Sequence, residues 1–184
     1  MSLLFQRVMK ITRRKVLQGV GVAFAATGLS QIGAASRLKV TRQTLRLPKW
    51  SADGFRVAVI SDLHVNTEPD AALTRRAFAL AYEAKPDLIA IPGDFYDEHR
   101  HDHIAMLAAA LTPVREQSVP VVATLGNHDY WSAPSRVIET VRQAGIRLLR
   151  NESMRVDEVL IHGIDDGIAN RDRHDALGQD GDAG

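Results

Sequence analysis

The chain has 184 residues, of which 45% are hydrophobic, and this length and composition suit one globular domain. It has no cysteine, which excludes disulfide bonds and thiolate-ligated metal sites and leaves only nitrogen and oxygen ligands for a metal. The net charge of +1 hides an uneven distribution, because residues 1–52 carry ten Lys and Arg and no acidic residue, while the rest has 13 basic and 22 acidic residues. An acidic body argues against a nucleic-acid partner, which needs basic patches.

The amino-terminal segment has the order of parts found in an export signal. Adjacent arginines at Arg13 and Arg14 precede an apolar run over residues 19–29, and small residues follow at 33–36. This order is typical of a signal peptide, and the adjacent arginines make it similar to a twin-arginine signal. The apolar run is shorter than the roughly 20 residues that span a bilayer. We therefore predict a twin-arginine-type signal over residues 1–36.

This prediction implies a partner and a location. The chain would be carried by the twin-arginine export machinery to the periplasm or to the outer face of the cytoplasmic membrane. Two fates of the signal stay open, namely cleavage after Ala35 or retention as a membrane anchor. An ordinary amphipathic or buried helix at the amino terminus is the alternative to an export signal.

The body of the chain alternates between expected strands and expected helices. Short β-rich runs predict strands, and apolar residues at helical spacing, such as Leu73 and Ala77, predict helices. Pro113 is expected to end or kink the second helix and Gly145 to end the third, with a turn near Asn151. Such alternation predicts a mainly parallel sheet, covered by helices, whose strands share one carboxyl edge. In chain order, the expected strands cover 38–47, 55–60, 87–91, 121–125, 146–149 and 159–161, and the expected helices cover 70–84, 103–112 and 134–144.

One polar cluster follows each of the second, third and fourth expected strands, so all three clusters are expected at the same edge of the sheet. Gly93 and Gly126 would let the backbone turn sharply beside a ligand. The spacing of Asp62 and His64 would point both side chains the same way from an extended segment. In chain order, the candidate site residues are Asp62, His64, Asp94, Asn127 and His128.

Carboxylate, imidazole and amide ligands together suit divalent ions such as Mn²⁺, Fe²⁺ or Zn²⁺. One carboxylate shared between two such ions can hold them about 3.5–4 Å apart. Each cluster alone has an ordinary explanation, because a lone histidine is more often structural and a Gly-Asp pair after a strand is more often a turn. All three clusters in this order, each behind an apolar strand, favour a metal site.

The three clusters resemble the calcineurin-like metallophosphoesterase family. The family pattern is D-x-H, then G-D-x-x-[DE], then G-N-H-[DE], followed by two histidine motifs that end in G-H-x-H. The first three blocks match completely at residues 62–64, 93–97 and 126–129, and the resemblance covers residues 38–170. The leader and the G-I-D-D run at 163–166 further resemble the exported bacterial branch. The resemblance implies an α/β/β/α sandwich in which a second sheet packs on the first.

The resemblance also implies roles for the matching residues. Asp62 and His64 would bind the first of two divalent ions, Asp94 would bridge both ions, and Asn127 would bind the second. His128 would be the general acid that protonates the leaving-group oxygen. The metals would activate the attacking water and neutralise the charge of the phosphoryl group.

The chain departs from the family pattern after Asp166. No G-H-x-H occurs there, although the family takes three metal-binding histidines from that region. The second sheet and the second metal shell are therefore expected to be incomplete, as in a chain truncated at its carboxyl end. On this interpretation residues 37–170 form the amino-terminal part of the domain, and residues 171–184 form a disordered tail.

Several other polar residues have two interpretations. Asp97 and Asp129 could orient the metal ligands through hydrogen bonds or could cap turns. His162 is expected to be an ordinary strand residue, and His174 is a spare histidine without the G-H-x-H context. The histidine cluster at 99–103 is expected to be a solvated loop or helix start rather than a weak metal site.

These features support two hypotheses of different kinds. The first is an exported, metal-dependent hydrolase of phosphate esters, most simply a phosphodiesterase that acts on an envelope phospholipid or a nucleotide-sugar. The alternative is a truncated, non-catalytic remnant of that domain that binds at most one metal. A nuclease of the same superfamily is disfavoured by the acidic body and the export signal.

Overall fold

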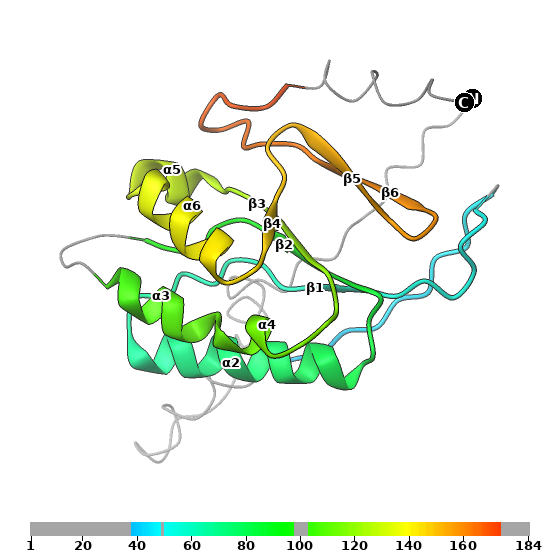
Figure 1. Ribbon diagram of the computed structural model, residues 1–184, viewed down its shortest axis with the longest axis horizontal. Coiled ribbons are helices and arrows are strands. Elements are labelled where there is room, and N and C mark those ends of the chain that lie inside the picture. Colours follow the sequence, from blue (N-terminus) through cyan, green and yellow to red (C-terminus); the bar gives the residue numbers. More distant parts are fainter. Residues whose placement is uncertain (1–37, 49, 98–102, 174–184) are drawn as a thin grey trace, which may run out of the picture.

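The computed structural model describes residues 38–48, 50–97 and 103–173 (Figure 1). The predicted export signal, the stretch from His99 to Asp102, His174 and the predicted tail beyond Arg173 lie outside these residues. At the centre of the described part is a four-stranded parallel sheet in the order β1-β2-β3-β4. This sheet confirms the predicted α/β class. Its strands are β1 (Val57–Val59), β2 (Leu88–Pro92), β3 (Val121–Thr124) and β4 (Arg147–Leu148).

Helices cover one face of this sheet. Phe78, Leu107 and Val141 come from three different helices, and they share one buried apolar cluster with Ile89 and Ile91 of β2. This cluster is the larger of the two apolar cores in the described part of the chain. Each fully buried side chain of this size stabilises the fold by roughly 1.5–3 kcal/mol. None of the helices in the described ranges combines the length and apolar character needed to cross a membrane. The helices are α2 (Glu68–Glu83), α3 (Ile104–Ala110), α4 (Thr112–Arg115), α5 (Asn127–Trp131) and α6 (Pro134–Gln143).

A two-stranded antiparallel hairpin covers the opposite face. Its strands are β5 (Glu152–Val156) and β6 (Val159–Gly163), which pair around a two-residue turn. Because side chains alternate along a strand, Leu88 of β2 and Val122 of β3 point away from the helices and join Leu149 and Val156 in a second buried cluster. The layers are therefore helices, parallel sheet and antiparallel pair, as Figure 1 shows.

Helix α2 begins two residues earlier than predicted because Thr67 and Asp70 form a capping box. The Thr67 side chain accepts a hydrogen bond from the backbone N–H of Asp70, and the Asp70 carboxylate accepts one from the backbone N–H of Thr67 at 3.0 Å. Both bonds satisfy backbone groups that a helix start would otherwise leave unpaired. This cap fixes where the chain leaves the first polar loop and enters the helix.

Three predicted features of secondary structure were wrong or incomplete. Residues 38–47 do not form a strand; none of the described strands pairs with this segment, which is largely exposed. Strand β5 was not predicted, since its mixed polar sequence has no clear alternation. The expected helix over 103–112 is divided at Leu111, and Pro113 sits in the first turn of α4, where its missing N–H costs nothing.

Candidate metal centre

The first polar motif follows β1 in an irregular loop rather than an extended segment. Asp62 and His64 both have positive φ angles, 58° and 43°, in a region that residues other than glycine rarely adopt. The loop is tied to its neighbour by the backbone N–H of His64, which donates to the Asp94 carbonyl at 3.0 Å. The predicted extended geometry for Asp62 and His64 is therefore wrong. Left-handed residues of this kind cluster at functional sites, where surrounding contacts hold them in place.

The two motif glycines allow the second and third loops to touch. Gly93 has a φ of 78°, so the predicted sharp turn is confirmed there. Gly126 has an ordinary φ of −100°, so the backbone conformation does not require glycine there. Glycine is needed because neighbouring atoms leave no room for a side chain. A Cβ on Gly93 would lie closer than 3.0 Å to the backbone of Gly126, and a Cβ on Gly126 would lie closer than 3.0 Å to the Asp94 carboxylate. The pair therefore brings Asp94 against the start of α5.

Asp129 joins these two loops from inside. Its carboxylate is fully buried and accepts four backbone hydrogen bonds, from Asp94 at 2.9 Å, Phe95 at 2.8 Å, Tyr96 at 3.1 Å and Gly126 at 2.9 Å. Burial raises the pKa of Asp129 to about 7; the nearby Asp94 charge also raises it, and the backbone bonds lower it. Asp129 was predicted either to cap a turn or to orient a metal ligand, and it has both positions. It caps the Gly126 turn, and it holds the backbone that carries Asp94.

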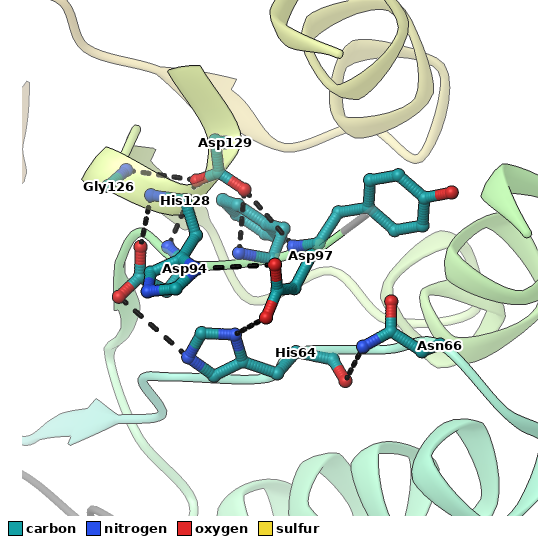
Figure 2. A network of polar contacts seen from close by, with 9 residues as sticks. His64, Asn66, Asp94, Asp97, Gly126, His128 and Asp129 are labelled. Atoms are coloured by element: carbon teal, nitrogen blue, oxygen red, sulfur yellow. Dashed lines mark hydrogen bonds and ion pairs between the residues drawn. The ribbon is translucent and has the colours of Figure 1, made fainter. Parts of the chain in front are cut away.

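Four side chains from the three loops converge at this edge of the sheet (Figure 2). The Nε2 atom of His64 lies 3.9 Å from Oδ2 of Asp94, and Nδ1 of His64 lies 3.9 Å from Oδ2 of Asp97. Nδ1 of His128 lies 3.3 Å from Oδ1 of Asp97. The rings of His64 and His128 meet edge to face with centroids 4.8 Å apart. Asp97 therefore lies between the two imidazoles, closer to that of His128 than to that of His64.

The donor atoms suit a divalent cation. Ligand atoms of His64, Asp94 and His128 all lie within 4.8 Å of one another. Separations of 3.9 Å are too long for hydrogen bonds, but they fall within the sum of two metal–ligand bonds of about 2.0–2.2 Å each. The buried Nδ1 of His64 has no hydrogen-bond partner in the described part of the chain. Two imidazoles and a carboxylate are ligands of Mn²⁺, Fe²⁺ and Zn²⁺, so the residues fit the metal that the motifs predict.

The other two predicted ligands flank this trio. Asp62 lies half-buried in the first loop, where its backbone N–H donates to the Gly93 carbonyl at 3.4 Å. It is not one of the three residues whose donor atoms lie within 4.8 Å of one another. Asn127 is the first residue of α5 and is also half-buried. The roles of Asp62, His64, Asp94 and Asn127 as metal ligands, and of His128 as general acid, stay predictions.

A polar network beyond the metal site was not predicted. The hydroxyl of Tyr130, on α5, donates to the buried carboxylate of Asp165, which also accepts from Nε of Arg150 at 3.1 Å. The guanidinium groups of Arg150 and Arg171 lie 5.8 Å and 5.5 Å from the centre of the Tyr130 ring. Asp165 belongs to the G-I-D-D run, which resembles the exported bacterial branch of the family. Nothing in the sequence near Asp165 predicts its contact with Tyr130.

His103 and His162, the other histidines among the described residues, are not part of the trio. His162 is an exposed residue of β6 whose Nδ1 lies 2.7 Å from the Ser153 hydroxyl across the hairpin, which confirms the expected strand position. His103 immediately precedes α3, which agrees with the expected helix start. The rest of its cluster lies outside the described residues.

Comparison with known families identifies the family of this chain. The sequence model of the calcineurin-like phosphoesterase family matches residues 55–178, which include all three polar loops. The chain therefore belongs to the calcineurin-like phosphoesterase family. The matched region holds the parallel sheet and the His64–Asp94–His128 trio together.

Named relatives place the chain more closely. It is 30% identical over 139 residues to the "uncharacterized metallophosphoesterase" of Aquifex aeolicus, an alignment that covers 72% of this chain and 50% of that protein. It is 29% identical over 149 residues to phosphodiesterase YaeI of Escherichia coli, covering 78% and 55% of the two chains. With the UDP-2,3-diacylglucosamine pyrophosphatase LpxG of Chlamydia muridarum it shares 33% identity over 119 residues, covering 61% and 36%. The chain thus spans about half the length of the first two relatives.

Proposed function

We propose that this chain is a metal-dependent phosphodiesterase whose full site uses two divalent ions. The observation that carries the proposal is the convergence of His64, Asp94 and His128 at the carboxyl edge of the parallel sheet. Relatives named phosphodiesterase and pyrophosphatase act on phosphate esters or anhydrides, which supports the same bond class here. Their names do not decide the substrate of this chain.

The residues have distinct tasks in this proposal. A bound divalent ion would act as a Lewis acid and lower the pKa of water. Asp94, with one oxygen accepting the His128 backbone N–H at 3.1 Å, would be held as a ligand by that bond. His128 would give a proton to the leaving-group oxygen. Asp97, 3.3 Å from Nδ1 of His128, would fix the imidazole orientation that this transfer needs.

Hydrolysis of bis(p-nitrophenyl) phosphate by the Mn²⁺-loaded chain tests the proposal. Wild type is expected to turn over, and Asp94→Asn is expected to lose at least about 100-fold in kcat/KM, the scale on which one electrostatic catalytic group acts. Asp157→Asn is the matched control, because Asp157 is exposed in the hairpin turn with a φ of 49° that asparagine tolerates. Turnover that survives Asp94→Asn unchanged would rule out this site.

The role of His128 can be separated from a ligand role. If His128 is the proton donor, His128→Gln keeps Mn²⁺ affinity and loses more activity with an alkyl leaving group than with p-nitrophenolate, which needs little protonation. If His128 binds the metal, the same change lowers Mn²⁺ affinity and slows both substrates equally. Mn²⁺ titration and the two rate ratios, measured on one preparation, decide between these outcomes.

A second candidate function is metal binding without turnover. The observation in its favour is that the described residues contain one cluster of three His, Asp or Glu donors, which suits one ion more directly than two. In that case one Mn²⁺ binds per chain and no phosphodiester is cleaved. Metal stoichiometry measured beside turnover separates the two functions, because two ions with turnover exclude the second.

The substrate proposed is an envelope phospholipid or a nucleotide-sugar. Support comes from the relative named for UDP-2,3-diacylglucosamine, a nucleotide-sugar that carries two acyl groups. Rates with a glycerophosphodiester lipid, a UDP-sugar and bis(p-nitrophenyl) phosphate, compared at equal concentration, test this assignment. A kcat/KM for both natural classes below that for the nitrophenyl ester would count against it.

We also propose export through the twin-arginine route. The paired Arg13 and Arg14 ahead of a short apolar run support this proposal. Residues 1–36 fused to a reporter that matures only in the periplasm are expected to deliver it there. Replacement of both arginines by lysine is expected to abolish delivery, and delivery that persists would point to another route.

A further inference from the structure

Trp131 is an exposed aromatic residue beside the candidate metal centre. It is the last residue of α5, and 62% of its surface is exposed. Residues three apart lie on the same side of a helix, which places the indole next to His128 with ring centroids 5.3 Å apart. His128 in turn meets His64 edge to face. His128 is therefore in ring contact both with His64 and with the exposed Trp131.

The exposure of Trp131 is not a by-product of how α5 is anchored. Asp129 fixes the helix from inside through its buried carboxylate, and Tyr130 fixes it to Asp165 and Arg150. Both residues hold α5 in place without the indole, which stays in water, where a large apolar surface is unfavourable. An unburied indole next to the proposed proton donor is well placed to cover an apolar group of a ligand.

We propose that Trp131 is a specificity-determining residue that holds the apolar group next to the phosphorus of the substrate. The inference rests on the proposed function, because it needs a phosphoryl group seated at the trio. With the phosphoryl oxygens there, a substituent on phosphorus that extends past the His128 ring reaches the indole, whose centroid lies 5.3 Å from that of His128. A flat apolar substituent gains stacking contact with the indole face, and a methyl group does not. Stacking of this kind changes affinity by about tenfold.

Two unreactive phosphonates test this directly on the Mn²⁺-loaded chain by calorimetry. Phenylphosphonate is expected to bind about tenfold more tightly than methylphosphonate, on the scale of aromatic stacking. Trp131→Ala is expected to reduce that ratio to about one while leaving methylphosphonate affinity unchanged. Trp131→Phe keeps a ring and is expected to retain part of the ratio. Leu45→Ala is the matched control, because Leu45 is 63% exposed in the segment before β1 and is expected to change nothing.

Fluorescence gives a second readout that does not depend on Trp131→Ala folding. The chain has two tryptophans, so Trp50→Phe leaves Trp131 as the sole emitter. Phenylphosphonate is expected to shift this emission to shorter wavelength, and methylphosphonate is not. Equal affinities for both phosphonates in wild type, or an unshifted emission at saturation, overturn the inference and leave the proposed function standing. Failure of methylphosphonate to bind, together with no hydrolysis of bis(p-nitrophenyl) phosphate, overturns both.

Discussion

The loops at the carboxyl edge of the parallel sheet and the β5–β6 hairpin are held by different means. The loops are joined through Asp129, whose buried carboxylate takes backbone hydrogen bonds from two of them. Among the described residues, the strands of the hairpin pair only with each other. The hairpin packs on the sheet through the small apolar cluster around Leu149 and Val156, Glu152 of β5 pairs with Arg147 of β4, and Asp165, just after β6, bonds to Tyr130. The loops where the metal is proposed to bind are therefore held by a buried carboxylate, and the hairpin mainly by apolar packing.

This difference has a physical reason. Metal ligands must be held in place before the ion arrives, so the loops that carry them need contacts that allow one arrangement. Positive φ angles at Asp62, His64 and Asp94 persist only because neighbouring loops hold them. The hairpin has no such task and can be held by ordinary apolar packing. Changes in the loops should therefore cost more than matched changes in the hairpin.

The largest effect is expected from crowding the two loops. Gly93→Ala combines an unfavourable φ with a clash against Gly126, and it should lower the free energy of unfolding by about 4 kcal/mol. Gly145→Ala is the matched change, because Gly145 has a φ of 85° and open space around it. Its cost should be about 1–2 kcal/mol, from φ alone. Urea denaturation of both variants measures the difference, and equal costs would show that the loops are not tightly packed.

The next largest loss of stability is expected from replacing the buried carboxylate of the loops, and it can be compared with the same change beside the hairpin. Asp129→Asn places an amide NH₂ against backbone N–H donors and should cost about 3 kcal/mol. Asp165→Asn keeps one oxygen for Tyr130, and its other partner, Arg150, is partly exposed to water, so its cost should be about 1 kcal/mol. Thermal denaturation gives the order of the two variants. A larger loss for Asp165→Asn would reverse the comparison.

The smallest effect is expected from removing one hydroxyl at the junction of the regions. Tyr130→Phe loses the bond to Asp165 and should cost about 1 kcal/mol near neutral pH. Burial and the Asp165 carboxylate raise the pKa of Tyr130 to about 12 from an ordinary value of 10.0. The phenol ionises first in the unfolded chain, so its stabilising contribution is present below about pH 10 and is lost as the pH rises toward 12.

The loss of the Tyr130 contribution at high pH can be measured by comparing wild type with Tyr130→Phe. The free energy of unfolding of wild type should fall between about pH 10 and pH 12 more steeply than that of Tyr130→Phe. Tyr82, whose pKa burial also raises, stays in both proteins and serves as the internal reference. Parallel curves for the two proteins across this window would mean that Tyr130 is not held as described.

The positions of the three polar clusters could be predicted from sequence, because short apolar runs before Asp62, Asp94 and Asn127 are strong strand signals. Parallel strands then bring their carboxyl ends to one edge. The conformation of the loops could not be predicted, since positive φ at Asp62 and His64 is imposed by contacts with residues about thirty positions away. The joining role of Asp129 depends on the same long-range contacts.

Short elements beside the site were missed for a related reason. Helix α5 has five residues, too few for any helical periodicity to be read from sequence. Its existence depends on the Asp129 anchor and on Tyr130 meeting Asp165, both tertiary contacts. The contact between Trp131 and His128 could therefore not be predicted, because it depends on α5, which puts residues three apart on the same side.

The central claim is that a metal ion binds at the edge of the sheet where His64, Asp94 and His128 converge, with His64 and Asp94 among its ligands. Equilibrium dialysis with Mn²⁺, followed by electron spin-echo measurement of nitrogen coupling to the bound ion, tests it most directly. We predict at least one Mn²⁺ per chain with histidine nitrogen coupling, a loss of binding in Asp94→Asn and His64→Asn, and full binding in Asp157→Asn. Equal Mn²⁺ binding by all four proteins, or a bound ion without nitrogen coupling, would contradict the account.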